Sequence, residues 1–174
     1  MGLVHKNFVV DAYSFKDDGV FPNSYLPVLH YRNALNLPTF FASEKIKKLF
    51  EANHWGNTWK SGLFTFHHYH SITHEVLGIY KGKTTVLLGG QNGRKVVIER
   101  GDVLLIPAGV SHKNLGDEDD ARCIGAYPDG KDYDMKYGKA AERPLADKNI
   151  YAVGLPSQDP LQGLKGKMQE YWKL

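Results

Sequence analysis

Short apolar runs broken by turn residues dominate the chain from Gly62 to Tyr127. Phe, Tyr, Val, Ile, Thr and Leu form the runs, and Gly, Asn and Asp interrupt them at intervals of roughly ten residues. This pattern is typical of an antiparallel β-sandwich or barrel. The clearest hairpin is TTVLLGGQNGRKVVIE, in which residues 89–93 turn one apolar run back on another. We therefore predict an all-β core over residues 62–127.

The opening region, residues 1–61, has a mixed pattern. Two extended segments, FVVDAYSF and SYLPVLHYR, are separated by a loop of turn residues. A short helix is predicted next, because Ser43 is a favourable N-cap residue and apolar side chains recur behind it at helical spacing as far as Asn53. The residues on that apolar face are Ile46, Leu49 and Phe50.

The closing region, residues 128–174, begins with the polar loop PDGKDYDMKYG. Its last eight residues are predicted to form one or two helical turns that pack as a cap over one mouth or edge of the barrel. The large side chains of this cap are Met168, Tyr171 and Trp172. No internal repeat or linker divides the sequence, and a length of 174 residues suits one core, so we predict a single domain over residues 1–174.

Composition and charge exclude several classes of protein. The chain is 42% hydrophobic and 24% charged, which is close to the average for folded globular proteins. The net charge of +3 is spread without a basic stripe interleaved with aromatic residues, so we expect no nucleic-acid partner. The sequence has no apolar run long enough to span a membrane and no secretory signal. We therefore expect no membrane partner and a cytoplasmic location.

The stretch HHYHSITHEVLGIYKG, residues 67–82, places four histidines and a glutamate in nine positions. We interpret residues 64–70 and 75–81 as two strands joined by a four-residue loop. Alternation then puts His68 and His70 on one face, and the loop sets His70 opposite Glu75. Directly opposed residues in an antiparallel pair share a face, with Cβ atoms about 5 Å apart. The three side chains are therefore predicted to converge.

This convergence predicts a metal site. Two imidazoles and a carboxylate on an apolar interior face lose their hydration, and a divalent cation offsets that cost. Such ligands suit Fe, Mn, Co, Ni, Cu or Zn, and two histidines with one carboxylate are the ligand set of non-haem iron oxygenases. In GDVLLIPAGVSHKN, turn residues place a further histidine at the start of another strand. The predicted metal ligands are His68, His70, Glu75 and His112.

A different loop length gives an alternative ligand set. A three-residue loop would set His74, and not Glu75, opposite His70 and create an all-histidine site. That register would also turn Gly78 inward in place of the apolar Leu77, which favours the first arrangement. The residues predicted to line the pocket around the ion, and to bind the substrate there, are Phe66, Leu77, Ile106 and Asn114.

Two motifs in this region resemble those of the cupin superfamily. The first motif is Gly, five residues, His-X-His, three or four residues, Glu, six residues, Gly, and it is matched by Gly62, His68, His70, Glu75 and Gly82. The second is Gly, five residues, Pro-X-Gly, two residues, His, three residues, Asn, and it is matched by Gly101, Pro107, Gly109 and His112. Its final Asn position is occupied by Gly116, and the nearest asparagine is Asn114. More narrowly, the segments HHYHSITHEVLG, YPDGKDYD and DPLQG resemble the YjlB-type group of bacterial cupins.

The resemblance implies a jelly-roll β-barrel with the ion inside it, and a homodimer formed through sheet edges. It does not select a reaction, because cupins include oxidoreductases, isomerases, decarboxylases, lyases and non-catalytic proteins. The metal ligands favour a dioxygenase-like oxidoreductase that acts on a small organic molecule, with Fe preferred and Mn, Ni, Zn or Cu as alternatives. Glu75 would be the catalytic base.

Two other functions stay open at this point. One is a redox-neutral isomerase or epimerase, in which a Lewis-acid metal such as Zn or Mn polarises a carbonyl group. The other is a non-catalytic protein that binds a small molecule or a metal without turnover. The three possibilities share the same predicted ligands and differ in the metal and in the fate of the bound molecule.

Overall fold

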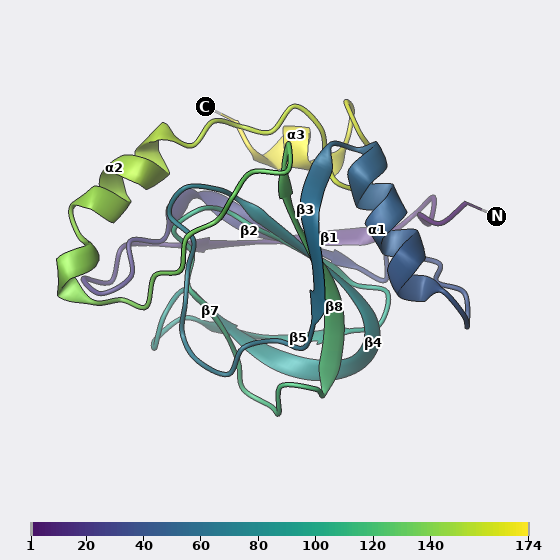
Figure 1. The fold of residues 1–174 in the computed structure, drawn as a ribbon, viewed down its shortest axis with the longest axis horizontal. Coiled ribbons are helices and arrows are strands. Elements are labelled where there is room, and N and C mark those ends of the chain that lie inside the picture. The colour runs from purple at the N-terminus through teal and green to yellow at the C-terminus, as the bar shows by residue number, and fades with distance from the viewer. Residues whose placement is uncertain (1, 174) are drawn as a thin grey trace.

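An eight-stranded antiparallel sheet curls into a barrel within residues 2–173, the part of the chain that the computed structural model describes (Figure 1). The sheet order is β1-β2-β6-β4-β8-β3, and β5 and β7 also pair with β4. The predicted all-β jelly-roll fold is confirmed. The strands are β1 (Val9–Phe15), β2 (Ser24–Arg32), β3 (Trp55–Ser61), β4 (Glu75–Leu88), β5 (Arg94–Glu99), β6 (Val103–Ile106), β7 (His112–Asn114) and β8 (Ala121–Pro128).

The long strand β4 joins the two halves of the barrel. Its first part pairs with β6 and β8, whereas its second part, from Lys83 onward, pairs with β5 and β7. Gly82 lies where the partners change and has a φ of 78°. A Cβ atom at this position would lie 1.9 Å from the carbonyl oxygen of Asp120, so the close approach requires glycine. This change of partners lets one strand close the barrel.

Of the two predicted hairpins, one is confirmed and one is wrong. The turn at residues 89–93 does join an antiparallel pair, from Lys83 opposite Glu99 to Leu88 opposite Arg94. The pairing of residues 64–70 with residues 75–81 does not exist, because residues 75–78 pair with β6 and residues 76–82 with β8. Alternation shows which side chains share a face of a strand, but it does not identify the neighbouring strand.

Residues 64–70 lie beside β7 instead. His68 forms an isolated bridge with His112, and the backbone N–H of Asn114 donates to the carbonyl oxygen of Phe64 at 2.9 Å. On the other side, Tyr69 bridges Lys136 in the closing region. The segment therefore reaches β7 without becoming a regular strand.

Helices pack on the outside of the barrel. They are α1 (Ala42–Ala52), α2 (Leu145–Ala152), α3 (Lys167–Tyr171) and the short 3-10 helix η1 (Ala140–Glu142). α1 is the predicted N-terminal helix, and Ile46 and Phe50 are fully buried, as its apolar spacing predicted. The N-cap prediction is wrong: Phe41 occupies that position with a φ of 62°, and Ser43 lies in the first turn, where its hydroxyl donates to Glu44 at 2.9 Å.

Two apolar cores lie on opposite faces of the sheet, and alternation along β4 divides its side chains between them. Leu77 and Ile79 belong to the inner core, whereas Val76 belongs to the outer core under α1 and α3. Gly78 also faces α1, where a Cβ atom would lie 2.7 Å from Ile46 Cγ2. Because each face of this part of β4 packs against a core, consecutive residues are all buried. Glu75 lies on the same face as Leu77 and Ile79, so its side chain points toward the inside of the barrel.

The predicted C-terminal cap is present as α3. Met168 and Trp172 are buried, and the Trp172 Nε1–H donates to the carbonyl oxygen of Pro27 in β2 at 2.8 Å. Helix α2, which was not predicted from the sequence, lies to one side of the barrel in Figure 1. No helix in the described part of the chain has the length and apolar character needed to cross a membrane.

Candidate metal centre

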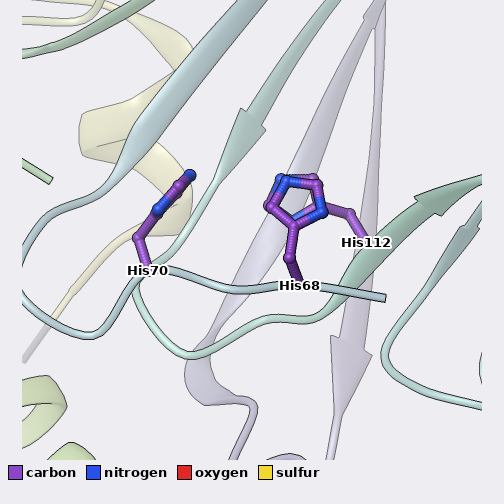
Figure 2. Close-up of side chains that lie close together, drawn as sticks. All are labelled: His68, His70 and His112. Atoms are coloured by element: carbon purple, nitrogen blue, oxygen red, sulfur yellow. The ribbon is translucent and has the colours of Figure 1, made fainter. Parts of the chain in front are cut away.

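Three buried histidines from two neighbouring segments converge inside the barrel. His68 and His70 lie on the segment before β4, and His112 begins β7 (Figure 2). One ring nitrogen of each histidine lies within 4.8 Å of the corresponding nitrogens of the other two. The bridge between His68 and His112 brings the two segments together. The structure thus places these three imidazoles side by side, although by a different strand pairing from the predicted one.

Backbone carbonyl groups orient all three rings in the same way. The Nδ1 atoms of His68 and His112 lie 3.1 Å from the carbonyl oxygens of Phe66 and Val110, two residues earlier in each case. The Nδ1 atom of His70 lies 2.5 Å from the carbonyl oxygen of Asp134. A carbonyl oxygen only accepts hydrogen bonds, so each Nδ1 carries the proton. In the neutral form, every Nε2 atom therefore presents a lone pair.

Glu75 brings a carboxylate to the same place. Its Oε2 atom lies 3.3 Å from Nε2 of His70 and 3.2 Å from Nε2 of His112. Oε1 accepts a hydrogen bond from the Tyr127 hydroxyl at 3.0 Å, whereas the buried Oε2 atom receives none from the described residues. An oxygen and imidazole nitrogens that all carry lone pairs thus face one another inside an apolar barrel, an arrangement that calls for a cation.

The pKa values of the cluster reflect this balance of burial and charge. Burial, helped by the neighbouring His112, lowers the pKa of His68 to about 3. Burial alone would raise the pKa of Glu75 and lower that of His70, but the attraction between these two groups outweighs it. The pKa of Glu75 is therefore lowered and that of His70 is raised. The carboxylate stays ionised, and its charge is balanced either by a proton on His70 or by a metal ion.

The geometry of the cluster fits a divalent transition metal. Bonds of about 2.0–2.2 Å place adjacent ligand atoms about 3.0–3.5 Å apart, and the two distances from Glu75 Oε2 fall in that range. Imidazole nitrogen and carboxylate oxygen are ligands that Fe, Mn, Co, Ni, Cu and Zn share. The cluster therefore suggests a divalent metal ion without defining which one. His68, His70, His112 and Glu75 would hold it.

A cavity of about 90 Å³ adjoins the cluster, and Tyr127 and Tyr133 are also among the residues around it. Most of its wall is apolar, and the predicted Leu77 and Ile106 are part of it. Other apolar wall residues include Leu63, Phe64, Val86, Leu88, Leu104 and Met135. For comparison, an engineered apolar cavity of about 150 Å³ binds benzene. The space beside the cluster is smaller than that cavity and therefore suits a small molecule.

Asn114 lines the cavity as predicted, but other parts of the protein engage its amide group. Its oxygen accepts hydrogen bonds from the Thr84 hydroxyl at 2.7 Å and from the backbone N–H of Gly116 at 3.0 Å. Its nitrogen donates to the carbonyl oxygen of Asp117 at 2.8 Å. These bonds hold the turn after β7, so a substrate-binding role for Asn114 stays a prediction that would require them to rearrange.

Phe66 lies elsewhere than expected. It was predicted to share the interior face with His68, but its side chain is 43% exposed and is not among the residues that line the cavity. Its ring stacks on Phe64, with centroids 4.9 Å apart, and lies 5.6 Å from the His68 ring. Strict alternation does not apply, because residues 64–70 are not a regular strand. Phe66 therefore covers the cluster from outside.

His74 is buried outside the cluster, so the structure does not support the all-histidine alternative. Its Nδ1 atom accepts the backbone N–H of Ala108 at 3.0 Å, and its Nε2 atom lies 3.2 Å from the carbonyl oxygen of Gly154. The ring also packs against Trp172, with centroids 4.7 Å apart. Burial lowers the pKa of His74 to about 4. Through these contacts, the neutral His74 ring links Gly154 and Trp172 of the closing region to the barrel.

Sequence reasoning missed the aromatic neighbours of the cluster. Tyr127 donates to Glu75 and itself accepts a hydrogen bond from Trp59 Nε1 at 2.8 Å. Tyr133 stacks on Tyr127, with centroids 4.8 Å apart. Alternation from the buried Cys123 to Tyr127 in RCIGAYP was an available signal, because both positions fall on one face of β8. This signal indicates that the Tyr127 side chain points into the barrel, but it does not identify Glu75 on β4 as its partner.

The jelly-roll barrel with three histidines and a glutamate inside it is that of a cupin. No protein-family model matches the sequence. The chain belongs to the YjlB family: it is 40% identical to the uncharacterized protein YjlB of Bacillus subtilis (strain 168) over 162 residues, which cover 92% of this chain and 95% of that protein.

Several solved structures are similar to parts of the chain. Acireductone dioxygenase from Bacillus anthracis is 18% identical, with a TM-score of 0.40, over 56% of this chain and 64% of that one. A DUF861-family protein from Thermotoga maritima is 30% identical, with a TM-score of 0.31, over 52% and 90%. Oxalate decarboxylase from Bacillus subtilis is 17% identical, with a TM-score of 0.34, over 76% and 28%.

Proposed function

We propose that this cupin is a metal-dependent enzyme, an oxidoreductase of the dioxygenase kind that acts on a small organic molecule. The observation that carries the proposal is the convergence of three Nε2 lone pairs and an ionised carboxylate at the wall of an apolar cavity. Neutral imidazoles with one carboxylate form the kind of ligand set that holds Fe(II) in non-haem oxygenases. When bound, such an ion supplies Lewis acidity and, as Fe(II), redox chemistry with dioxygen.

The cavity wall would select and hold the substrate. Leu77, Leu104 and Ile106 present hydrocarbon next to the histidines, so an apolar part of the substrate displaces water there. Removing water also strengthens every electrostatic interaction at the cluster. A small organic molecule with one polar end directed at the metal and an apolar body against this wall fits these requirements.

Glu75 would move a proton during the reaction. Its carboxylate is ionised because the neighbouring imidazoles lower its pKa, and its Oε2 atom points at the site. If Glu75 leaves the metal during turnover, Oε2 becomes free to accept a proton from bound substrate, while the Tyr127 hydroxyl continues to donate to Oε1. Glu75 would thus be a metal ligand in the resting site and the catalytic base after its release.

The proposal is tested by metal identity and by access to the metal. Protein purified without added metal is expected to contain Fe, and the Fe(II) form is expected to bind nitric oxide, a dioxygen substitute, with a new EPR signal. Fe(II) binds nitric oxide only where a coordination position is open. Zn in the purified protein and no nitric oxide signal after Fe(II) loading would contradict a dioxygenase and favour the redox-neutral isomerase. Ligand binding without turnover under all conditions would favour the non-catalytic protein.

We also propose a homodimer. Strand β1 lies at one end of the sheet order, so its outer edge is available for pairing among the described residues. Val9 on this strand is 53% exposed. Sedimentation equilibrium is expected to give twice the chain mass, and a mass of one chain at micromolar concentration would contradict the dimer.

A further inference from the structure

We propose that Tyr127, held in place by Trp59, is a positioning residue that fixes the Glu75 carboxylate for metal binding through a single oxygen, Oε2. The inference rests on the proposed function insofar as it requires a metal at the histidine cluster. It assigns a role to two aromatic residues that belong to neither of the two sequence motifs.

The direction of the hydrogen bonds is fixed by the chemistry of the three groups. An indole N–H only donates, so the Tyr127 oxygen accepts from Trp59 Nε1 at 2.8 Å. An ionised carboxylate only accepts, so the single Tyr127 proton goes to Glu75 Oε1 at 3.0 Å. The chain Trp59 to Tyr127 to Glu75 is therefore polarised in one direction, and each bond strengthens the next.

This series of hydrogen bonds gives the two oxygens of Glu75 different partners. Oε1 is occupied by the tyrosine hydroxyl, and Oε2 is left to face His70 and His112 at 3.3 Å and 3.2 Å. Rotation of the carboxylate to present both oxygens to an ion would break the bond from Tyr127 in a buried site. Hydrogen bonds of this kind orient a ligand and typically contribute a factor of about 10–100 in metal affinity.

Small and aromatic residues around this chain hold its members in place. Trp59 in β3 lies opposite Gly125 in β8, and a Cβ atom at Gly125 would lie 2.1 Å from Trp59 Cε2. Only glycine at this position lets the indole lie across the strand and reach Tyr127. On the other side, Tyr133 stacks on the Tyr127 ring with an interplanar angle of 19°. Trp59 and Tyr133 therefore hold the Tyr127 side chain from two sides, and its hydroxyl donates only toward Glu75.

The test compares Tyr127→Phe, Trp59→Phe and the double variant, with Co(II) as the probe. Co(II) affinity is measured by competition with a chelator, and the visible absorption spectrum reports the ligand geometry. We expect Tyr127→Phe to bind Co(II) about 10-fold or more weakly, with a changed spectrum, because the freed carboxylate alters its binding mode. Trp59→Phe is expected to give a smaller change in the same direction. The double variant should match Tyr127→Phe, because Trp59 acts only through Tyr127.

Tyr80→Phe is the matched control, because its hydroxyl accepts from Arg122 Nε at 3.1 Å and makes no contact with Glu75. Circular dichroism establishes that each variant is folded. A Tyr127→Phe variant with the affinity and spectrum of the wild type would overturn this inference alone. Additive losses in the double variant would also overturn it, since they would show that Trp59 acts by another route. A wild-type protein that binds no Co(II) would overturn it together with the proposed function.

Discussion

The barrel contains two buried combinations of histidine and carboxylate, and they differ in how the carboxylate is satisfied. In the first, Asp102 Oδ2 lies 2.9 Å from His30 Nε2 and accepts the backbone N–H of Glu99 at 3.1 Å, while its Oδ1 accepts that of Asn33 at 2.7 Å. In the second, Glu75 has one satisfied oxygen and one that faces imidazole nitrogens without a donor from the described residues. Both carboxylates are almost fully buried.

This difference shows that a buried histidine beside a buried carboxylate is not by itself a sign of function. Asp102 accepts two backbone N–H groups and contacts the His30 ring, which links the end of β2 to the turn between β5 and β6, so its role is structural. Glu75 is left unsaturated next to a cavity, and the three nearby imidazoles are turned so that in their neutral form they add lone pairs and no donors. The orphaned Oε2 atom and the orientation of the rings distinguish a candidate metal site from the hydrogen-bonded pair of His30 and Asp102.

The largest expected effect concerns the structural pair. Asp102→Asn replaces an acceptor by an amide that cannot satisfy all of its donors, and it leaves His30 without its carboxylate. We expect the free energy of unfolding in urea to fall by about 3 kcal/mol, as for other broken buried pairs. Metal affinity of the folded variant is expected to stay at the wild-type value. A stable Asp102→Asn protein with weakened metal binding would show that the two combinations are not separate.

Glu75→Gln is expected to have the opposite signature. We expect metal affinity to fall by about 100-fold, because the variant loses the carboxylate of the cluster. The free energy of unfolding of the metal-free protein should fall less than in Asp102→Asn, because the Tyr127 hydroxyl can still donate to the amide oxygen and the new amide N–H can donate to a neighbouring imidazole. Urea unfolding with and without added Co(II) measures both quantities. A large loss of stability without metal would contradict a functional reason for the unsaturated Oε2 atom.

A smaller effect is expected from acid. The pKa of His68 is about 3 in the folded protein and near its ordinary value of 6.5 in the unfolded chain. Below about pH 6.5, His68 therefore binds a proton in the unfolded chain but not in the folded protein. Stability of the metal-free protein therefore falls as the pH decreases through this window. Between pH 7 and pH 5, His68→Gln should lose about 2 kcal/mol less than the wild type in urea unfolding. Equal losses would place His68 in a more solvated environment than the structure does.

The sequence predicted the members of the cluster better than the way in which they meet. Motif spacing singled out His68, His70, Glu75 and His112, and the structure brings all four together; their role as ligands stays a prediction. The assumed hairpin was wrong, because the pattern of alternation does not say that β6 and β8 flank β4. Compact strands and turns with glycine were predictable because their signals are local.

What the sequence did not predict depends on contacts between distant segments. Tyr127 and Trp59 meet Glu75 through the register of β3, β8 and β4, which no local pattern encodes. Strand β3 itself was missed, because WGNTWKS is too polar to resemble a buried strand. Phe66 was expected inside, but the bridges from His68 and Tyr69 to different neighbours break the alternation that would have turned it inward.

The most direct measurement is elemental analysis of the wild type and of a His68→Ala and His112→Ala double variant, purified side by side without added metal. His67→Ala serves as the control, because this neighbouring side chain points to Ser111 and Gln91, away from the cluster. We predict about one transition-metal ion per chain in the wild type and the control, and almost none in the double variant, which should keep a β-rich circular dichroism spectrum. Equal metal content in all three proteins would contradict a metal centre formed by these histidines.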